Sequence, residues 1–220
     1  MKKNIIFNLA AVVLVFLSAA ASFSLLEQLG EFSISSNIEL MFFLGFAGYL
    51  VVHIVFYKPV FVHVMAHELT HILWAMLFGG RAKKLEISGK GGKVLINRSN
   101  FLISLAPYFF PLYTVFFMII FLIAKVQYHP YIAFFIGASF SFHIALTLYS
   151  MRTDQSDFVE DSSLFFSLLF IYFMNVLVIA LLFSVISPDK FTARDFAVNV
   201  SANLWDIMKF MGNAVNEMLK

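Results

Sequence analysis

Six long apolar segments dominate the chain, and each is close in length to a membrane-spanning helix. They cover residues 5–26, 39–57, 60–78, 101–124, 131–149 and 163–186. A helix needs about 20 predominantly apolar residues to cross a bilayer. The pattern therefore predicts an all-α polytopic membrane protein with about six transmembrane helices, in a single transmembrane domain over residues 1–188.

The region between the third and fourth apolar segments has a different periodicity. Gly79 and Gly80 end the helical pattern, and the runs KKLEIS and KVLIN then alternate apolar and polar residues on either side of residues 89–92. Alternation around a cluster of glycines is typical of a β-hairpin. We therefore expect a short β-hairpin after this helix, with a solvated basic loop as the alternative.

The tail, residues 189–220, carries apolar side chains at helical spacing with polar residues between them. The apolar positions are Leu204, Ile207, Met208, Met211, Val215, Met218 and Leu219. This spacing predicts a C-terminal amphipathic helix that lies at the membrane interface. A helix that binds a partner protein is the alternative.

The composition agrees with a membrane protein. Hydrophobic residues make up 61% of the 220 residues and charged residues 13%, whereas soluble domains average about 45–50% and about 25%. The net charge is only +2, and no basic cluster is interleaved with aromatic residues in a polar segment, so we expect no nucleic-acid partner. Because the chain has no cysteine, any metal must be held by His, Asp or Glu.

The first apolar segment has two interpretations. Lys2 and Lys3, the apolar run and the small residues SAAAS together resemble a secretory signal peptide. The run is about 22 residues long, against about 7–15 for a signal peptide, so we expect an uncleaved span. The two lysines favour a cytoplasmic N-terminus, which would place residues 81–98 outside. The basic residues of that loop favour the cytoplasm instead, and we prefer this second orientation.

One apolar segment, the expected helix over residues 60–78, carries a cluster of ionisable side chains. HELTH, residues 67–71, follows the pattern His-Glu-x-x-His. Positions i and i+4 share one helix face, so His67 and His71 can bind one Zn²⁺, and Glu68 can activate a zinc-bound water. Ionisable residues within a span cost about 2.5–3.5 kcal/mol each and usually serve a function. The motif therefore predicts a zinc site, with a polar helix face packed inside the bundle as the alternative.

His63 lies on the same segment but is a poor third ligand. It precedes His71 by eight residues, which is about 12 Å along a helix axis. One zinc with ligand bonds of about 2.0–2.1 Å cannot join both residues on a straight helix. We expect His63 to lie beside the site or its access route, or to be a structural histidine.

A catalytic zinc needs a third protein ligand, with the fourth position left to water. The stretch MRTDQSDFVEDSS, between the fifth and sixth apolar segments, is the only acidic cluster that can supply it. Its candidates are Asp154, Asp157, Glu160 and Asp161, and His143 in the fifth segment is the rival without a carboxylate.

The fourth apolar segment contains SLAPYFFPL, in which Pro107 and Pro111 each remove a backbone donor. Irregular backbone at membrane depth is tolerated mainly where it is buried in protein or lines a wet cavity. We therefore expect this segment to kink, either beside the active site or for structural reasons alone.

The stretch HELTHILWAMLFGGRAKKLEI, followed by GKGGKVLI and LAPYFFPLY, resembles the site-2 protease group of intramembrane zinc metallopeptidases. The narrower likeness is to the small bacterial branch described as peptidase M-fifty-B-like. The resemblance covers residues 60–161, which is under half of the chain.

The resemblance implies that His67 and His71 bind zinc, that Glu68 is the general base, and that a later carboxylate completes the site. The Asn-Pro…Leu-Asp-Gly pattern that supplies this carboxylate in well-studied members is lacking here. The narrower branch often has Ser-Asp at this place, which QSDF matches at Asp157, with Asp154 as the second choice.

We therefore expect a zinc metalloprotease of the bacterial inner membrane that hydrolyses peptide bonds of membrane protein or peptide substrates within or near the bilayer. The hairpin is expected to bind an unwound substrate segment by strand addition. The alternatives are a non-proteolytic zinc-binding scaffold or chaperone, a metal transporter, and a lipid-modifying hydrolase.

Overall fold

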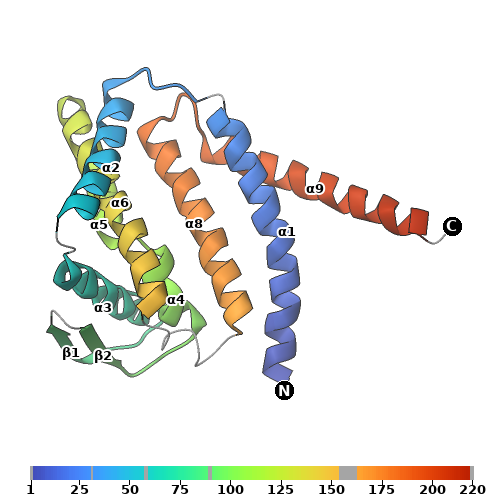
Figure 1. Ribbon diagram of the computed structural model, residues 1–220, viewed down its shortest axis with the longest axis horizontal. Coiled ribbons are helices and arrows are strands. Elements are labelled where there is room, and N and C mark those ends of the chain that lie inside the picture. Colours follow the sequence, from blue (N-terminus) through green and yellow to red (C-terminus); the bar gives the residue numbers. More distant parts are fainter. Residues whose placement is uncertain (1, 31, 57–58, 89–90, 154–162, 219–220) are drawn as a thin grey trace. The chain divides into compact units, whose positions relative to one another are not determined.

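The computed structural model describes residues 2–30, 32–56, 59–88, 91–153 and 163–218. Most of these residues are helical, and two short strands follow the third helix (Figure 1). The elements in chain order are α1 (Lys2–Gly30), α2 (Asn37–Val55), α3 (Val60–Leu77), β1 (Ala82–Ser88), β2 (Gly91–Ile96), α4 (Phe101–Phe109), α5 (Leu112–Ile123), η1 (Val126–Tyr128), α6 (His129–Thr153), α8 (Leu164–Ile186) and α9 (Ala193–Met218).

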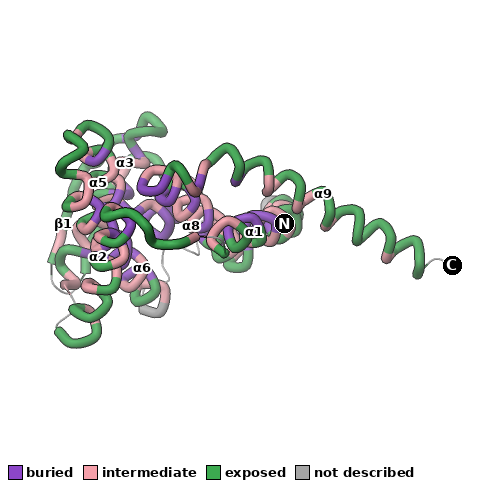
Figure 2. Tube along the Cα trace, turned by 90° about the horizontal axis from the view of Figure 1, so that it is seen from above, coloured by how far each residue is buried: buried purple, intermediate pink, exposed green. Residues whose placement is uncertain are grey.

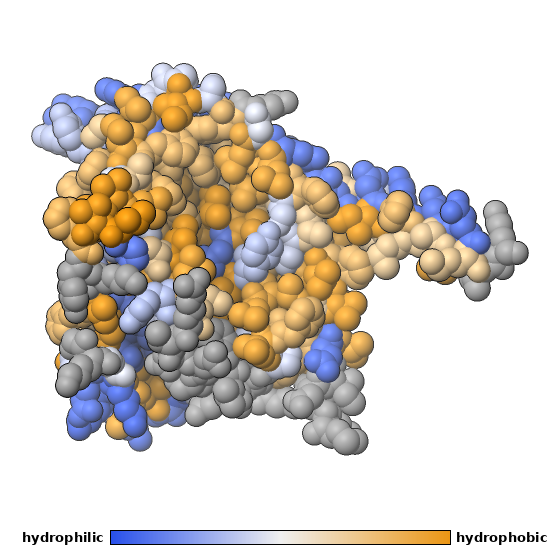
Figure 3. Space-filling model, viewed as in Figure 1, coloured by the Kyte–Doolittle hydropathy of each residue, from blue (hydrophilic) through white to orange (hydrophobic). Residues whose placement is uncertain are grey.

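Apolar helices long enough to cross a membrane make up most of the fold. In the described part of the chain, five single helices pass this test, and α4 with α5 form a bent pair that passes it together. Apolar side chains are exposed over much of the face that Figure 3 shows, and Ile54 and Ile123 are each 80% exposed. Lipid is the solvent that suits such a surface, so the chain is an integral membrane protein of mainly α-helical structure, as predicted.

Contacts within the chain divide it into two compact units. One contains residues 1–33 and 163–220, which hold α1, α8 and α9. The other contains residues 34–162, which hold α2 to α6 and both strands. The HELTH motif, the strands and the broken helix pair therefore all belong to the second unit.

The expected β-hairpin is present directly after α3. Gly79 has a φ of 73°, a left-handed conformation that glycine adopts easily and that ends a helix. β1 and β2 then pair antiparallel, with Leu85 opposite Val94 and Ile87 opposite Gly92. These two pairs share one face of the hairpin, because side chains alternate between faces along a strand.

The fourth apolar segment is broken at its prolines, as predicted. Its two halves, α4 and α5, meet at an angle of 70°. Pro107 lies inside α4, and Pro111 immediately precedes α5. Asn100 starts α4, since its Oδ1 accepts a hydrogen bond from the backbone N–H of Ile103 at 2.9 Å.

α2 and α6 approach each other closely at two glycines. A Cβ atom at Gly45 would lie 1.9 Å from the backbone oxygen of Phe134. A Cβ atom at Gly137 would lie 2.0 Å from the backbone oxygen of Phe42. Small residues commonly permit such backbone contact between membrane helices, so these glycines set the distance between α2 and α6.

We expect Gly45→Ala to destabilise the protein by about 1–3 kcal/mol, because the added methyl group forces α2 away from α6. Gly48→Ala on the same helix is the matched control, since no described atom outside the local backbone of α2 and its two chain neighbours lies within 4 Å of its Cβ position. Alanine there gains about 0.5–1 kcal/mol of helix stability. The thermal unfolding midpoints of both variants in detergent are the measurement, and equal midpoints would contradict the packing argument.

Candidate metal and catalytic site

α3 brings the two histidines of the motif together on one face. The Nε2 atoms of His67 and His71 are 3.3 Å apart. Two nitrogens that each lie about 2.0–2.1 Å from one tetrahedral zinc are about 3.3–3.4 Å apart. The pair therefore has the spacing of two nitrogen ligands on one zinc ion. The same separation is within hydrogen-bond distance.

His71 is oriented by the backbone of α4. Its Nδ1 lies 2.9 Å from the carbonyl oxygen of Ile103. Because a carbonyl oxygen only accepts, Nδ1 carries the proton of the neutral ring and Nε2 keeps its lone pair. Histidine ligands of metals usually donate their other ring N–H in this way, which fixes the ring and its tautomer.

The Ile103 carbonyl is free to accept from His71 because its usual helical donor is missing. In an α-helix each carbonyl accepts from the N–H of the residue four positions later. Here the residue is Pro107, which has no N–H. The proline that breaks the fourth apolar segment thus also frees the oxygen that orients His71.

We expect Pro107→Ala to weaken zinc binding about 10–100-fold, the usual effect of disturbing a ligand's hydrogen-bond partner. The substitution adds a backbone N–H that competes with His71 for the Ile103 carbonyl. Zinc affinity is measured by competition with a chromogenic chelator. Pro111→Ala is the matched control, since Pro111 lies in the break between α4 and α5 and not four residues after Ile103, and equal affinities in all three proteins would contradict the argument.

Glu68 lies on α3, and its buried side chain faces the hairpin. A Cβ atom at Gly92 would lie 2.8 Å from Glu68 Oε1 and 2.6 Å from Val64 Cγ1. The hairpin face that carries Gly92 is therefore turned to α3, and its backbone covers the Glu68 side chain. Only glycine at position 92 permits this approach.

We expect Gly92→Val to lift the hairpin from α3, because its side chain and that of Glu68 would occupy the same space. Limited trypsin digestion after Lys84 and Lys93 should then become faster, since local opening exposes these bonds. Glu86→Val is the control, because it places the same side chain on the outer face, opposite Lys93. Equal digestion rates in the two variants would show that Gly92 does not hold the hairpin down.

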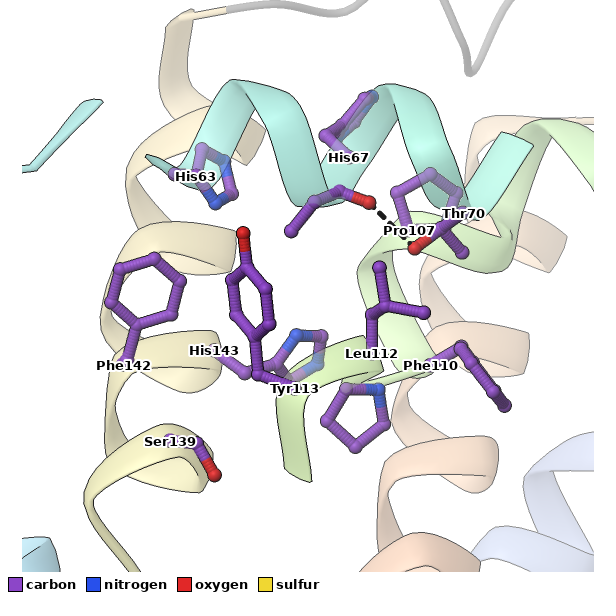
Figure 4. A pocket seen from close by; sticks show the side chains of 12 residues that line it. His63, His67, Thr70, Pro107, Phe110, Leu112, Tyr113, Ser139, Phe142 and His143 are labelled. Carbon is purple, nitrogen blue, oxygen red and sulfur yellow. Dashed lines mark hydrogen bonds between the residues drawn. The ribbon is translucent and has the colours of Figure 1, made fainter. Parts of the chain in front are cut away.

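A small cavity of about 20 Å³ lies beside the motif, between α3, the α4–α5 break and α6. Its volume is enough for one water molecule. Figure 4 shows the Tyr113 hydroxyl pointing toward α3, where it donates to the carbonyl of Val62 at 3.1 Å. The cavity therefore joins the broken helix pair to the His67 side of the motif.

Two further histidines line this cavity. His63 Nε2 lies 2.6 Å from Ser150 Oγ on α6, which gives this histidine a partner away from His71. His143 is buried on α6, and no described residue lies within hydrogen-bond distance of its Nε2. The cavity is large enough for one water molecule, which would satisfy this nitrogen.

The sequence-predicted site residues are thus only partly brought together. His67, Glu68 and His71 lie together on α3, whereas His63 and His143 line the neighbouring cavity. Within the described ranges, no group of three or more His, Cys, Asp or Glu side chains could hold a metal ion. Asp154, Asp157, Glu160 and Asp161 lie outside the described residues.

Two groups that shape the site, the Ile103 carbonyl and Gly92, were not predicted from the sequence. The Ile103 carbonyl has a signal that could have revealed it, namely a proline four residues later in a helical segment. Gly92 has a weaker signal, because it is one of three glycines among residues 89–92 and only the fold shows which of them meets α3.

Comparisons with known proteins do not assign a family. No family model, curated protein or solved structure matches the chain. The resemblance to site-2 proteases therefore rests on the residues of the motif, the hairpin and the broken segment.

Proposed function

We propose that this protein is an intramembrane zinc metalloprotease of the bacterial inner membrane, which hydrolyses peptide bonds of membrane-associated protein substrates. The observation that carries the proposal is the 3.3 Å spacing of the His67 and His71 Nε2 atoms, with Glu68 on the same turn of a helix apolar enough to span a bilayer. Polar groups at such a depth are costly, and catalysis is the use that accounts for all three.

His67 and His71 would hold the zinc ion through their Nε2 atoms, and we propose Asp157 as the third protein ligand. The Ile103 carbonyl supports this arrangement, because it keeps the His71 Nε2 lone pair available. Zinc, when bound, would lower the pKa of a coordinated water to about 7 and polarise the scissile carbonyl.

Glu68 is the proposed general base. Its carboxylate accepts the proton of the attacking water and then delivers it to the leaving amine, a role worth about 10²–10⁴-fold in rate. Gly92 lies against its Cγ and Oε1 atoms, so the carboxylate is held in place and shielded from bulk water. The hairpin therefore contributes to the site by fixing the base.

Substrate binding is proposed to use the same hairpin. Peptide bonds in a helix are shielded from attack, so a substrate segment must unwind first. Within the described residues the sheet has two strands, and each strand has one edge that pairs with no other strand. An unwound segment would add to such an edge through backbone hydrogen bonds, close to Glu68.

The test is hydrolysis by the purified, zinc-loaded protein in lipid vesicles. The probes are casein, which is largely unfolded, and a synthetic transmembrane peptide with a helix-breaking Asn-Pro pair, with products identified by mass spectrometry. New internal termini that disappear with a zinc chelator support the proposal. Cleavage of phospholipid esters without peptide cleavage would favour a lipid hydrolase, and no cleavage of either probe would contradict the proteolytic function.

A further inference from the structure

α9 is a long helix with one apolar side. Leu204, Met208, Met211 and Val215 recur on successive turns, and the polar residues Asp206, Asn213 and Glu217 lie on the opposite side. Figure 3 shows these two sides as separate hydrophilic and hydrophobic bands along the helix. Most of α9 is exposed (Figure 2), and Met208 and Val215 are 57% and 53% exposed. An exposed apolar stripe of this length needs a partner.

A groove of about 420 Å³ separates this stripe from α1, which belongs to the same compact unit. Every side chain that lines the groove is apolar. Val13, Phe16 and Leu17 form the α1 wall, and Leu204, Met208 and Met211 form the α9 wall. The α1 wall lies within a candidate membrane span, Ile6–Gly30, so the groove is at the depth of hydrocarbon chains.

Polar contacts attach α9 near the opposite end of that wall. Asn203 Nδ2 donates to Ser24 Oγ at 3.0 Å and to Glu27 Oε2 at 3.1 Å. Glu27 lies one turn before α1 ends at Gly30, whereas Val13 to Leu17 lie further inside the span. A charged group near the end of a span is where a membrane surface would lie, and the apolar groove is further into the span than these polar contacts.

Trp205 lies beside the apolar stripe and is largely exposed. Lys209 Nζ sits 5.3 Å from the centroid of its ring. Tryptophan is enriched where a membrane meets water, with its ring among the headgroups. Its position at the border between the two sides of α9 agrees with a helix that lies in this layer.

We propose that the groove between α1 and α9 binds phospholipid acyl chains, with α9 lying along the bilayer surface and its apolar stripe turned to the hydrocarbon. Acyl chains are the occupant that fits, because one wall is a membrane span and no lining side chain is polar. α9 carries two basic and three acidic residues over Ala193–Met218, so its charge favours neither an acidic nor a basic protein partner. The inference is independent of the proposed proteolysis.

Single-cysteine labelling tests the groove directly, because the chain has no cysteine of its own. Met208→Cys, Val215→Cys and Asn213→Cys are each labelled with a nitroxide in phosphatidylcholine vesicles. Collision with oxygen, which concentrates in hydrocarbon, is compared with collision with a water-soluble nickel chelate. We expect the labels at 208 and 215 to gain oxygen collisions and lose nickel collisions, and the label at 213 to show the reverse.

Two outcomes would overturn the proposal. Nickel collisions at all three positions would mean that α9 lies in water, where its stripe is open to a protein partner. Loss of both collision types at 208 would mean that protein fills the groove. Circular dichroism of each labelled variant checks that the helices are retained. Met211→Cys, on the same apolar stripe, replaces a stripe variant that fails to fold, and Glu217→Cys replaces Asn213→Cys on the polar side.

Discussion

Glu68→Gln is expected to abolish peptide hydrolysis while the bound zinc is retained. Glutamine has nearly the shape of glutamate, so its contact with Gly92 survives and the hairpin stays on α3. An amide cannot accept the proton of the attacking water, and the loss of a general base lowers the rate by about 10²–10⁴-fold. Turnover of the cleaved probe and zinc content per chain are measured on the same preparation.

Glu86→Gln provides the control for this result, because Glu86 is exposed on the outer face of the hairpin and pairs with Lys84. It should keep full activity, since exposed ion pairs contribute little. If Glu68→Gln cleaved as fast as the unchanged protein, Glu68 would not be the base. If neither protein cleaved anything while both held zinc, the non-proteolytic scaffold would become the better interpretation.

His67→Ala is expected to remove the zinc. The unchanged protein should hold about one zinc ion per chain, as a single site with three protein ligands predicts. Removal of one nitrogen of the His67–His71 pair leaves a site with too few ligands, and His71→Ala should have the same effect. The measurement is metal content of the detergent-purified protein by mass spectrometry after reloading and desalting.

Variants of other residues separate the candidates for the third ligand. Asp157→Ala should lose zinc, as His67→Ala does, whereas Asp154→Ala and His143→Ala should retain it. His63→Ala is the matched histidine control, because its Nε2 is engaged with Ser150 Oγ. Zinc lost in His143→Ala but kept in Asp157→Ala would move the third ligand to α6. If the wild-type protein held no zinc after reloading, the proposal of a metallopeptidase would lose its basis.

The helices and their membrane character follow from local properties of the chain. Apolar length alone places α1, α2, α3, α6 and α8 within a few residues of their predicted bounds. The hairpin follows from alternation around glycines, and the break between α4 and α5 follows from prolines that lack a backbone donor. The His67–His71 pair is also local, because positions i and i+4 of any helix share a face.

Contacts between residues far apart in sequence could be found only in the tertiary structure. His71 meets the Ile103 carbonyl, Glu68 meets Gly92, and the apolar side of α9 meets α1 across a groove. Each contact depends on how separate elements pack, and periodicity reports only which side of an element is apolar. The sequence by itself therefore determined a helical membrane protein with a candidate zinc pair, and the tertiary structure decided what orients His71, what covers Glu68 and where α9 leaves a groove.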